Sequence, residues 1–261
     1  DVSGMTLYQG LLLGHGTRGG AVRNFHLNAS GWTQSGYAGR PTGADALDGQ
    51  NELAAFEDYL TRTVTEFTLG DAQEVHIFSS FGIDIATDIR LIADPYTGGS
   101  FRGTTWGVVF DGSHNGIVGE NGCAADLTML GTMGIFNKQG GGYNVVTKKG
   151  FSGEINMFNQ DAWGSNSKLA YVEGGTVNLV QYFSWCAYEA ECFEGGTLNL
   201  LGSTIVANNG NNGGSLPTAT YHSGAKGAVI GTLDCSETLN IEVEDGATVD
   251  MKLNGTMYEG W

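Results

Sequence analysis

The chain has 261 residues and a formal net charge of −16, and it contains 43 glycines but only three prolines. An acidic surface of this kind repels phosphate backbones, which disfavours nucleic-acid binding, and it disfavours anionic polysaccharides unless a local basic patch or a bridging cation compensates the charge. No apolar run approaches the roughly 20 residues that span a bilayer, so we expect no membrane insertion.

The first half of the chain alternates short apolar bursts with Gly, Asp and Ser, which is typical of short strands joined by tight turns. The bursts cover residues 11–13, 75–78, 89–92 and 108–110. Between the first two, apolar residues step by three or four, which predicts an amphipathic helix within an insertion over residues 48–70. The apolar residues of this predicted helix are Leu53, Phe56, Leu60, Val64 and Phe67.

A charged segment follows, in which strand alternation places Asp84, Asp88 and Arg90 on one outer face, with Arg102 further along. Carboxylates beside arginines are one way to build a sugar-binding groove. The competing interpretation is a solvated face whose surface ion pairs contribute little stability.

The densest polar cluster runs from Asp111 through Ser113, His114 and Asn115 to Glu120. Asp111, Ser113 and Asn115 match the opening of a calcium loop, although Glu120 comes two residues before the position of the usual closing glutamate. An Asx-type turn is the alternative. Asp111 and Glu120 also form a candidate carboxylate pair for glycoside hydrolysis, in which one carboxyl acts as acid and the other as base or nucleophile.

The second half carries an internal repeat. Gly174-Gly175-Thr176-Val177-Asn178-Leu179 recurs 21 residues later as Gly195-Gly196-Thr197-Leu198-Asn199-Leu200, and shorter copies occur at residues 153–157 and 237–241. In each copy two apolar residues flank a polar one, so a strand of this kind buries its face only when the copies stack.

The repeat therefore predicts a three-sheet parallel β-helix with about 21–22 residues per turn, in a single domain over residues 1–261, with a loop bulging out at 208–217. Stacked in register, the copies form two interior columns and one outward asparagine ladder. The first column is Ile155, Val177, Leu198 and Leu239; the second is Met157, Leu179, Leu200 and Ile241; the ladder is Asn156, Asn178, Asn199 and Asn240. A leucine-rich repeat is the competing solenoid, but its leucine spacing is missing.

These Gly-Gly-Thr-φ-Asn-φ turns, with neighbours such as residues 203–209, resemble the pectin-lyase-like superfamily of right-handed β-helices. The resemblance covers residues 105–255 well and residues 1–100 loosely, and it implies a fold, because the superfamily includes lyases, hydrolases, tailspikes and adhesins. Its polygalacturonase branch uses a Gly-His-Gly, which occurs here at residues 14–16, but the branch's other motifs are missing.

Function is predicted from the fold and from side chains near turns. We expect an extracellular, secreted or particle-surface protein that recognises a polysaccharide and cleaves it if the carboxylates meet. The catalytic candidates are Asp111, Glu120, Asp84 and Asp88; the substrate-binding candidates are Arg90, Arg102, Trp106, His114, Trp163 and Trp185. The alternatives are a non-catalytic fibre or adhesive segment, packed as a homotrimer or against neighbouring segments, and an ice- or mineral-binding array on the Thr and Asn columns.

Four cysteines occur without zinc-type spacing. Cys186 and Cys192 are close enough in sequence to close a small disulfide loop in an oxidising compartment. Four buried thiols are the alternative.

Overall fold

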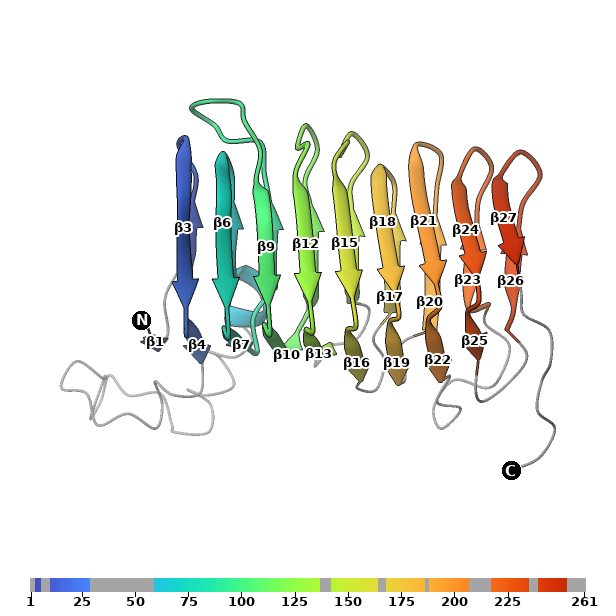
Figure 1. Ribbon diagram of the computed structural model, residues 1–261, viewed down its shortest axis with the longest axis horizontal. Helices are drawn as coiled ribbons and strands as arrows, with labels where there is room; N and C mark the ends of the chain where they lie inside the picture. Colours follow the sequence, from blue (N-terminus) through green and yellow to red (C-terminus); the bar gives the residue numbers. More distant parts are fainter. Residues whose placement is uncertain are drawn as a thin grey trace.

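The computed structural model describes residues 3–5, 10–28, 59–136, 142–163, 168–185, 188–206, 217–234 and 239–252. These residues form a parallel β-helix, in which each turn, or rung, contributes one strand to each of three parallel nine-stranded sheets. The rungs stack side by side along the long axis of the molecule (Figure 1). The predicted fold class is confirmed.

The strands of the three sheets follow one another in strict rotation. Sheet A contains β1 (Ser3–Met5), β4 (His26–Asn28), β7 (Phe81–Ile83), β10 (Val109–Ser113), β13 (Met133–Phe136), β16 (Asp161–Trp163), β19 (Phe183–Trp185), β22 (Thr204–Val206) and β25 (Leu233–Asp234). Sheet B contains β2 (Leu11–Leu13), β5 (Thr65–Leu69), β8 (Thr87–Leu91), β11 (Asn115–Gly119), β14 (Tyr143–Thr147), β17 (Lys168–Val172), β20 (Tyr188–Cys192), β23 (Ala219–Tyr221) and β26 (Ile241–Val243). Sheet C contains β3 (Thr17–Arg23), β6 (Ala72–Phe78), β9 (Arg102–Trp106), β12 (Asp126–Leu130), β15 (Glu154–Phe158), β18 (Gly175–Val180), β21 (Gly196–Leu201), β24 (Lys226–Ile230) and β27 (Thr248–Lys252).

Sheet C contains the sequence repeat in the predicted register for three copies. Ile155, Val177 and Leu198 pair in sequence and are fully buried, as are the residues two positions further along each strand. The asparagine between them faces outward in each strand, and the three amides bond along the ladder: Asn199 Nδ2 donates to Asn178 Oδ1 at 2.6 Å, and Asn178 Nδ2 donates to Asn156 Oδ1 at 2.7 Å.

The fourth predicted copy is wrong. Ile241 lies in sheet B, and the strand that follows Leu198 in sheet C is β24, where Gly227 takes the interior position. The ring of Tyr221 fills that space, because a Cβ on Gly227 would lie 2.4 Å from Tyr221 Cε1. Because the apolar side chain at this interior position comes from sheet B, the sequence of β24 itself lacks the alternating apolar pattern by which the other copies were found.

Sheet B departs from simple alternation in a way that repeats. In β5, β8, β14 and β17 both the second and the third residue are buried, while the first and fourth face outward. The second residue is skipped in the strand pairing, as in Thr65↔Thr87 followed by Phe67↔Ile89. This irregularity turns the polar second residues of β5 and β8, Glu66 and Asp88, into the interior.

A single residue with positive φ makes the corner between sheets C and A in eight successive rungs. The corner residues are Asn24, Ser79, Gly107, Gly131, Asn159, Gln181, Gly202 and Gly231, with φ between 50° and 62°. The residue after each corner is buried, as are Ser80, Val108 and Tyr182. The last residue of each sheet C strand and the first residue of each sheet A strand therefore lie on either side of one sharp bend.

The predicted helix is only partly correct. Residues 59–63 are helical, but Phe67 lies in β5, where it is fully buried between Leu11 and Ile89. Pairing with two neighbouring strands overrides the helical spacing of its apolar residues. Leu53, Phe56 and residues 208–216 of the predicted loop over 208–217 lie outside the described residues.

The cysteines show no disulfide in the described part of the chain. Cys123 and Cys192 are free and buried, which rules out the predicted Cys186–Cys192 loop. Burial raises the pKa of Cys192 to about 12.

Candidate functional site

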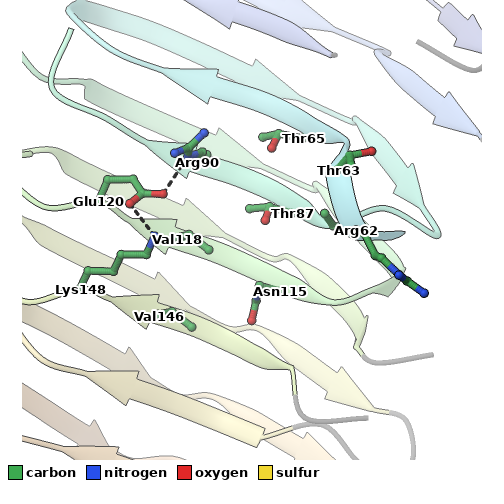
Figure 2. Close-up of a pocket in the computed structure, with 11 residues that line it drawn as sticks. Arg62, Thr63, Thr65, Thr87, Arg90, Asn115, Val118, Glu120, Val146 and Lys148 are labelled. Atoms are coloured by element: carbon green, nitrogen blue, oxygen red, sulfur yellow. Dashed lines mark hydrogen bonds and ion pairs between the residues drawn. The ribbon is translucent and has the colours of Figure 1, made fainter. Parts of the chain in front are cut away.

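A groove of about 280 Å³ lies on the outer face of sheet B, over the second to fifth rungs (Figure 2). The alternation in sheet B points its lining residues outward from neighbouring strands in register, with Thr65, Thr87 and Asn115 in one row. Arg90, Val118 and Val146 form the next row. Arg62 and Thr63 come from the helical segment before β5 and line one side of the groove.

Glu120 is the centre of the charged part of this groove. Its Oε1 accepts a bond from Arg90 Nε at 2.8 Å, and its Oε2 lies 2.7 Å from Lys148 Nζ. Figure 2 shows the carboxylate bridging these two cations, which come from the rungs on either side of its own. Although burial raises the pKa of Glu120, the hydrogen bonds from Lys148 and Arg90 outweigh it and lower the pKa below its ordinary value.

The groove is locally basic in a chain that is strongly acidic. Arg62, Arg90 and Lys148 line it, and Glu120 is the single carboxylate among the described residues that do so. The remaining polar lining consists of threonine hydroxyls and one asparagine amide, which are short donors and acceptors suited to hydroxyl groups. Such a surface suits a ligand that carries both hydroxyls and negative charge.

The structure does not bring the four predicted catalytic carboxylates into one groove, although Asp84, Asp88 and Asp111 lie near one another: the backbone N–H of Asp84 donates to the Asp111 carbonyl at 2.8 Å, and the charge of Asp111 acts on Asp88. Asp88 is fully buried, so the expectation that it faces outward is wrong, and its Oδ1 accepts a bond from Ser113 Oγ at 2.9 Å inside the solenoid. Asp84, which directly follows β7, is also buried, at 7% exposure, so the expectation that it faces outward is wrong as well. Asp111 lies in sheet A, away from the residues that line the groove. Of the four, only Glu120 lies in the groove.

The predicted calcium ligands point in different directions. Ser113 is buried against Asp88, whereas Asn115 lies on the outer face of sheet B, where its Oδ1 accepts a bond from the backbone N–H of Tyr143 at 3.1 Å. A calcium ion needs oxygens that converge, so these residues do not fit one. Elsewhere in the described chain, His, Cys, Asp and Glu side chains form no group of three that could hold a metal ion.

The predicted substrate-binding residues are spread over separate faces. Arg90 lies in the groove, but Arg102 and Trp106 lie on the outer face of sheet C, where Arg102 Nε is 3.2 Å from Asp126 Oδ2 and Trp106 is 59% exposed. His114 lies at the bend between sheets A and B, and its backbone N–H donates to Ile85. Trp163 and Trp185 are strand partners in sheet A; their side chains lie outside the described part of the structure.

The Gly-His-Gly turn has a structural role. The backbone N–H of His15 donates to Asp94 Oδ2 at 2.7 Å, and Asp94 also accepts bonds from the backbone of Tyr96 and Thr97. These backbone hydrogen bonds, with that of His15 the largest, lower the pKa of Asp94. Asp94 thus ties two surface turns together.

Sequence reasoning missed two features of sheet B. Lys148 follows β14, lines the groove and pairs with Glu120. His222, which has no recognisable partner in the sequence, stacks on Phe193 at a centroid distance of 4.4 Å and lies between Glu191 and Glu244. Their separations of 31 and 22 residues along the chain left no local signal.

No described helical segment has the length and hydropathy needed to cross a bilayer. Family models, curated proteins and solved structures give no significant match to this chain, so its fold is assigned from the strand topology.

Proposed function

We propose that this protein is a recognition solenoid that binds an acidic glycan in the groove on the outer face of sheet B. The observation that carries the proposal is the local charge of the groove: three cations and one carboxylate in a chain of net charge −16. An anionic polysaccharide needs such a basic patch to approach an acidic protein. The threonine and asparagine side chains beside the cations supply partners for sugar hydroxyls.

Binding without hydrolysis is the form of this function that the groove supports best. Glycoside hydrolysis needs two carboxyl groups across one bond, about 5–10 Å apart. Glu120 is the single carboxylate in the described lining, and its lowered pKa keeps it ionised, whereas a general acid must carry a proton near neutral pH.

Glu120 also indicates the kind of group that the cations hold. Its carboxylate bridges Arg90 and Lys148, two cations contributed by different rungs. A uronate carboxylate or a sulfate presents oxygens of the same kind and charge, so a ligand group competes with Glu120 for the two cations. We infer that acidic sugars are preferred over neutral ones.

We extend the proposal to the structural superfamily of the protein and to its location relative to the cell. The Gly-Gly-Thr-φ-Asn-φ turns support membership of the pectin-lyase-like superfamily, and a glycan ligand supports work outside the cytoplasm. Neither inference changes the site.

The test is a binding titration of acidic and neutral glycan oligosaccharides, followed by calorimetry on the hits and a reducing-end assay. The double variant Arg90→Ala/Lys148→Ala should lose binding to acidic hits by about tenfold or more, because each charge-assisted contact contributes about 1.5–3 kcal/mol. Arg102→Ala removes an exposed arginine from sheet C and serves as the matched control.

Three results would contradict the proposal. One is equal binding of neutral and acidic sugars, and a second is equal loss in the double variant and the control. Release of reducing ends would show that the protein is a hydrolase and that its carboxylates lie elsewhere.

A further inference from the structure

Two carboxyl groups meet in the interior of the solenoid, beneath the groove on sheet B. They are Glu66 in β5 and Asp88 in β8, and both are fully buried. Each is the residue that the pairing of these neighbouring strands skips, so both side chains turn inward at equivalent positions. The residues before them, Thr65 and Thr87, line the groove on the outer face.

A glycine leaves the room in which the two groups meet. Gly82 lies in β7 of sheet A and is buried, and a Cβ at this position would lie 2.7 Å from Glu66 Oε2 and 2.7 Å from Asp88 Oδ1. The two oxygens are therefore no farther apart than twice that distance. A calcium ion holds its ligands at about 2.3–2.6 Å, so oxygens on opposite sides of one ion are about 5 Å apart. The separation of the pair is within the reach of a single ion.

The oxygens of this pair have few partners in the described structure. Both oxygens of Glu66 and Oδ2 of Asp88 accept no hydrogen bond from the described residues. Asp88 Oδ1 accepts a bond from Ser113 Oγ at 2.9 Å. The register of β10 shifts between Asp111 and Ser113, and Ser113 is fully buried, so its hydroxyl lies beside the pair. Three side chains thus bring five oxygens together.

No positive side chain of the described chain is buried beside these carboxyls. The buried polar residues in the described ranges include no Lys, Arg or His. A carboxylate that is removed from water without a counter-charge is strongly destabilised, and it takes up a proton instead. Protons meet this requirement at low pH. When both groups are ionised, a cation from solution is needed to meet it.

We propose that Glu66, Asp88 and Ser113 form an interior binding site for one calcium ion, which replaces the protons of the two carboxyls as the pH rises. The two carboxylates balance the charge of a divalent ion. The set differs from a cluster of three acidic, imidazole or thiol ligands, of which the described chain has none that could hold a metal ion, because a serine hydroxyl takes the third place.

The ligand atoms and their surroundings select the ion. Carboxylates and hydroxyls are hard oxygen ligands, which suit calcium or magnesium better than zinc or copper. Magnesium usually keeps several of its waters. The strand neighbours of Gly82 in sheet A, Leu27 and Phe110, are buried apolar side chains that offer a hydrated ion no hydrogen bonds. Calcium, which accepts flexible sets of protein oxygens, therefore fits this interior better.

The same corner gives a cation an acidic approach from the surface. Asp111 is only partly buried, and its carbonyl accepts a bond from the backbone N–H of Asp84 at 2.8 Å. Asp84 lies deeper, at 7% exposure, and the charge of Asp111 acts on Asp88. Bound inside this corner, the ion joins β5, β8 and β10, which belong to three successive rungs. The ion thereby fixes the strands that carry the groove.

The first test is calorimetric titration of the chelator-treated full chain with calcium chloride between pH 5 and pH 8, in buffers of different ionisation enthalpy. We expect one tight site that releases about one to two protons per ion at pH 6 and binds more strongly as the pH rises. Exposed carboxylates ionise near pH 4, so ions held loosely on the acidic surface release no protons. Magnesium chloride should bind at least about tenfold more weakly.

The second test uses variants of the ligands. Glu66→Gln and Asp88→Asn keep the size of the side chain but remove one charge, and each should weaken calcium binding by about 100-fold or more, because losing even an outer partner of a metal ligand costs about 10–100-fold. Ser113→Ala keeps both carboxyls and should weaken binding by about tenfold. Glu194→Gln, which removes an exposed carboxylate, is the matched control. At pH 8, calcium should raise the urea midpoint of the wild type and the control but not of the first two variants.

Three outcomes would overturn the proposal. The first is no calcium binding by the wild type at pH 8, which would leave protons as the only ligands of the pair. The second is binding without proton release, which would place the ions on the acidic surface. The third is equal calcium binding by Glu66→Gln and Glu194→Gln. Because proton release is measured on the wild type, the proposal can be refuted even if a variant fails to fold.

Discussion

Two carboxyl groups are enclosed together in the interior of the solenoid, and their protonation should control its stability. Glu66 is fully buried, and both of its carboxyl oxygens lack a hydrogen-bond partner in the described structure. Asp88 is also fully buried and bonds only through Oδ1, to Ser113. A Cβ on Gly82 would lie 2.7 Å from Glu66 Oε2 and 2.7 Å from Asp88 Oδ1, so the two groups meet over that glycine.

Both pKa values are raised well above their ordinary range. Burial is the main cause for Glu66, and the charge of Asp88 adds to it. For Asp88, burial dominates over the opposing bond from Ser113, and Asp111 raises the pKa further. The folded protein therefore favours the protonated carboxyls, whereas the unfolded chain ionises them near pH 4.

The sign of the pH dependence follows. Because the pKa of each carboxyl is higher in the folded protein than in the unfolded chain, its contribution to the free energy of unfolding is complete below the unfolded pKa. That contribution is lost as the pH rises from the unfolded pKa toward the folded pKa. In that window each retained proton costs about 1.4 kcal/mol per pH unit in the free energy of unfolding. Glu66→Gln removes one titration, so its stability relative to the wild type should rise by about that slope from pH 4 upward.

The assay is urea unfolding of wild type and variant between pH 4 and pH 8, read as the difference in free energy of unfolding at each pH. Glu194→Gln, which removes an exposed carboxylate, is the matched control. A difference for Glu66→Gln that stays flat with pH, or that turns against the variant as the pH rises, would refute the reasoning.

Three further predictions concern stability and reactivity. Asn178→Ala breaks the middle of the asparagine ladder and should cost about 1–2 kcal/mol in the free energy of unfolding; an equal effect of Thr176→Ala would contradict this. Tyr182→Phe removes the hydroxyl that accepts a bond from buried Asn144 Nδ2 and should cost about 1–3 kcal/mol, measured by urea unfolding; an unchanged midpoint would show that the amide finds another partner. Buried Cys192, whose pKa is raised to about 12, should resist alkylation at pH 8 until urea unfolds the chain, as peptide mass mapping would show; rapid labelling of the folded protein would contradict this.

The repeat was sufficient to predict the fold because the apolar or polar character of each residue indicates whether its side chain faces the interior or solvent. Val177, Asn178 and Leu179 alternate inward and outward with period two, and their copy 21 residues later can stack only in one register without exposing a column. The same reasoning failed for Asp88, because sheet B skips one residue in its pairing and buries two in succession. That irregularity arises from contacts with neighbouring strands and leaves no mark in the sequence of β8.

The sequence could not predict which residues meet in the candidate site, because the turns between strands differ in length. Equivalent residues in sheet C are 21 positions apart between Thr176 and Thr197 but 29 between Thr197 and Lys226. No single period therefore predicts which side chains share a face. Arg90 meets Glu120 across 30 residues, and Lys148 joins them from the next rung.

The sequence by itself determined that this chain stacks short strands into a parallel solenoid, because glycine bends and alternating apolar residues act locally and repeat. Only the tertiary structure decided that Glu66 and Asp88 are enclosed, and that Arg90, Glu120 and Lys148 form one groove. Those outcomes depend on which residues the rungs bring into register, and that register is set by the stacking of whole turns.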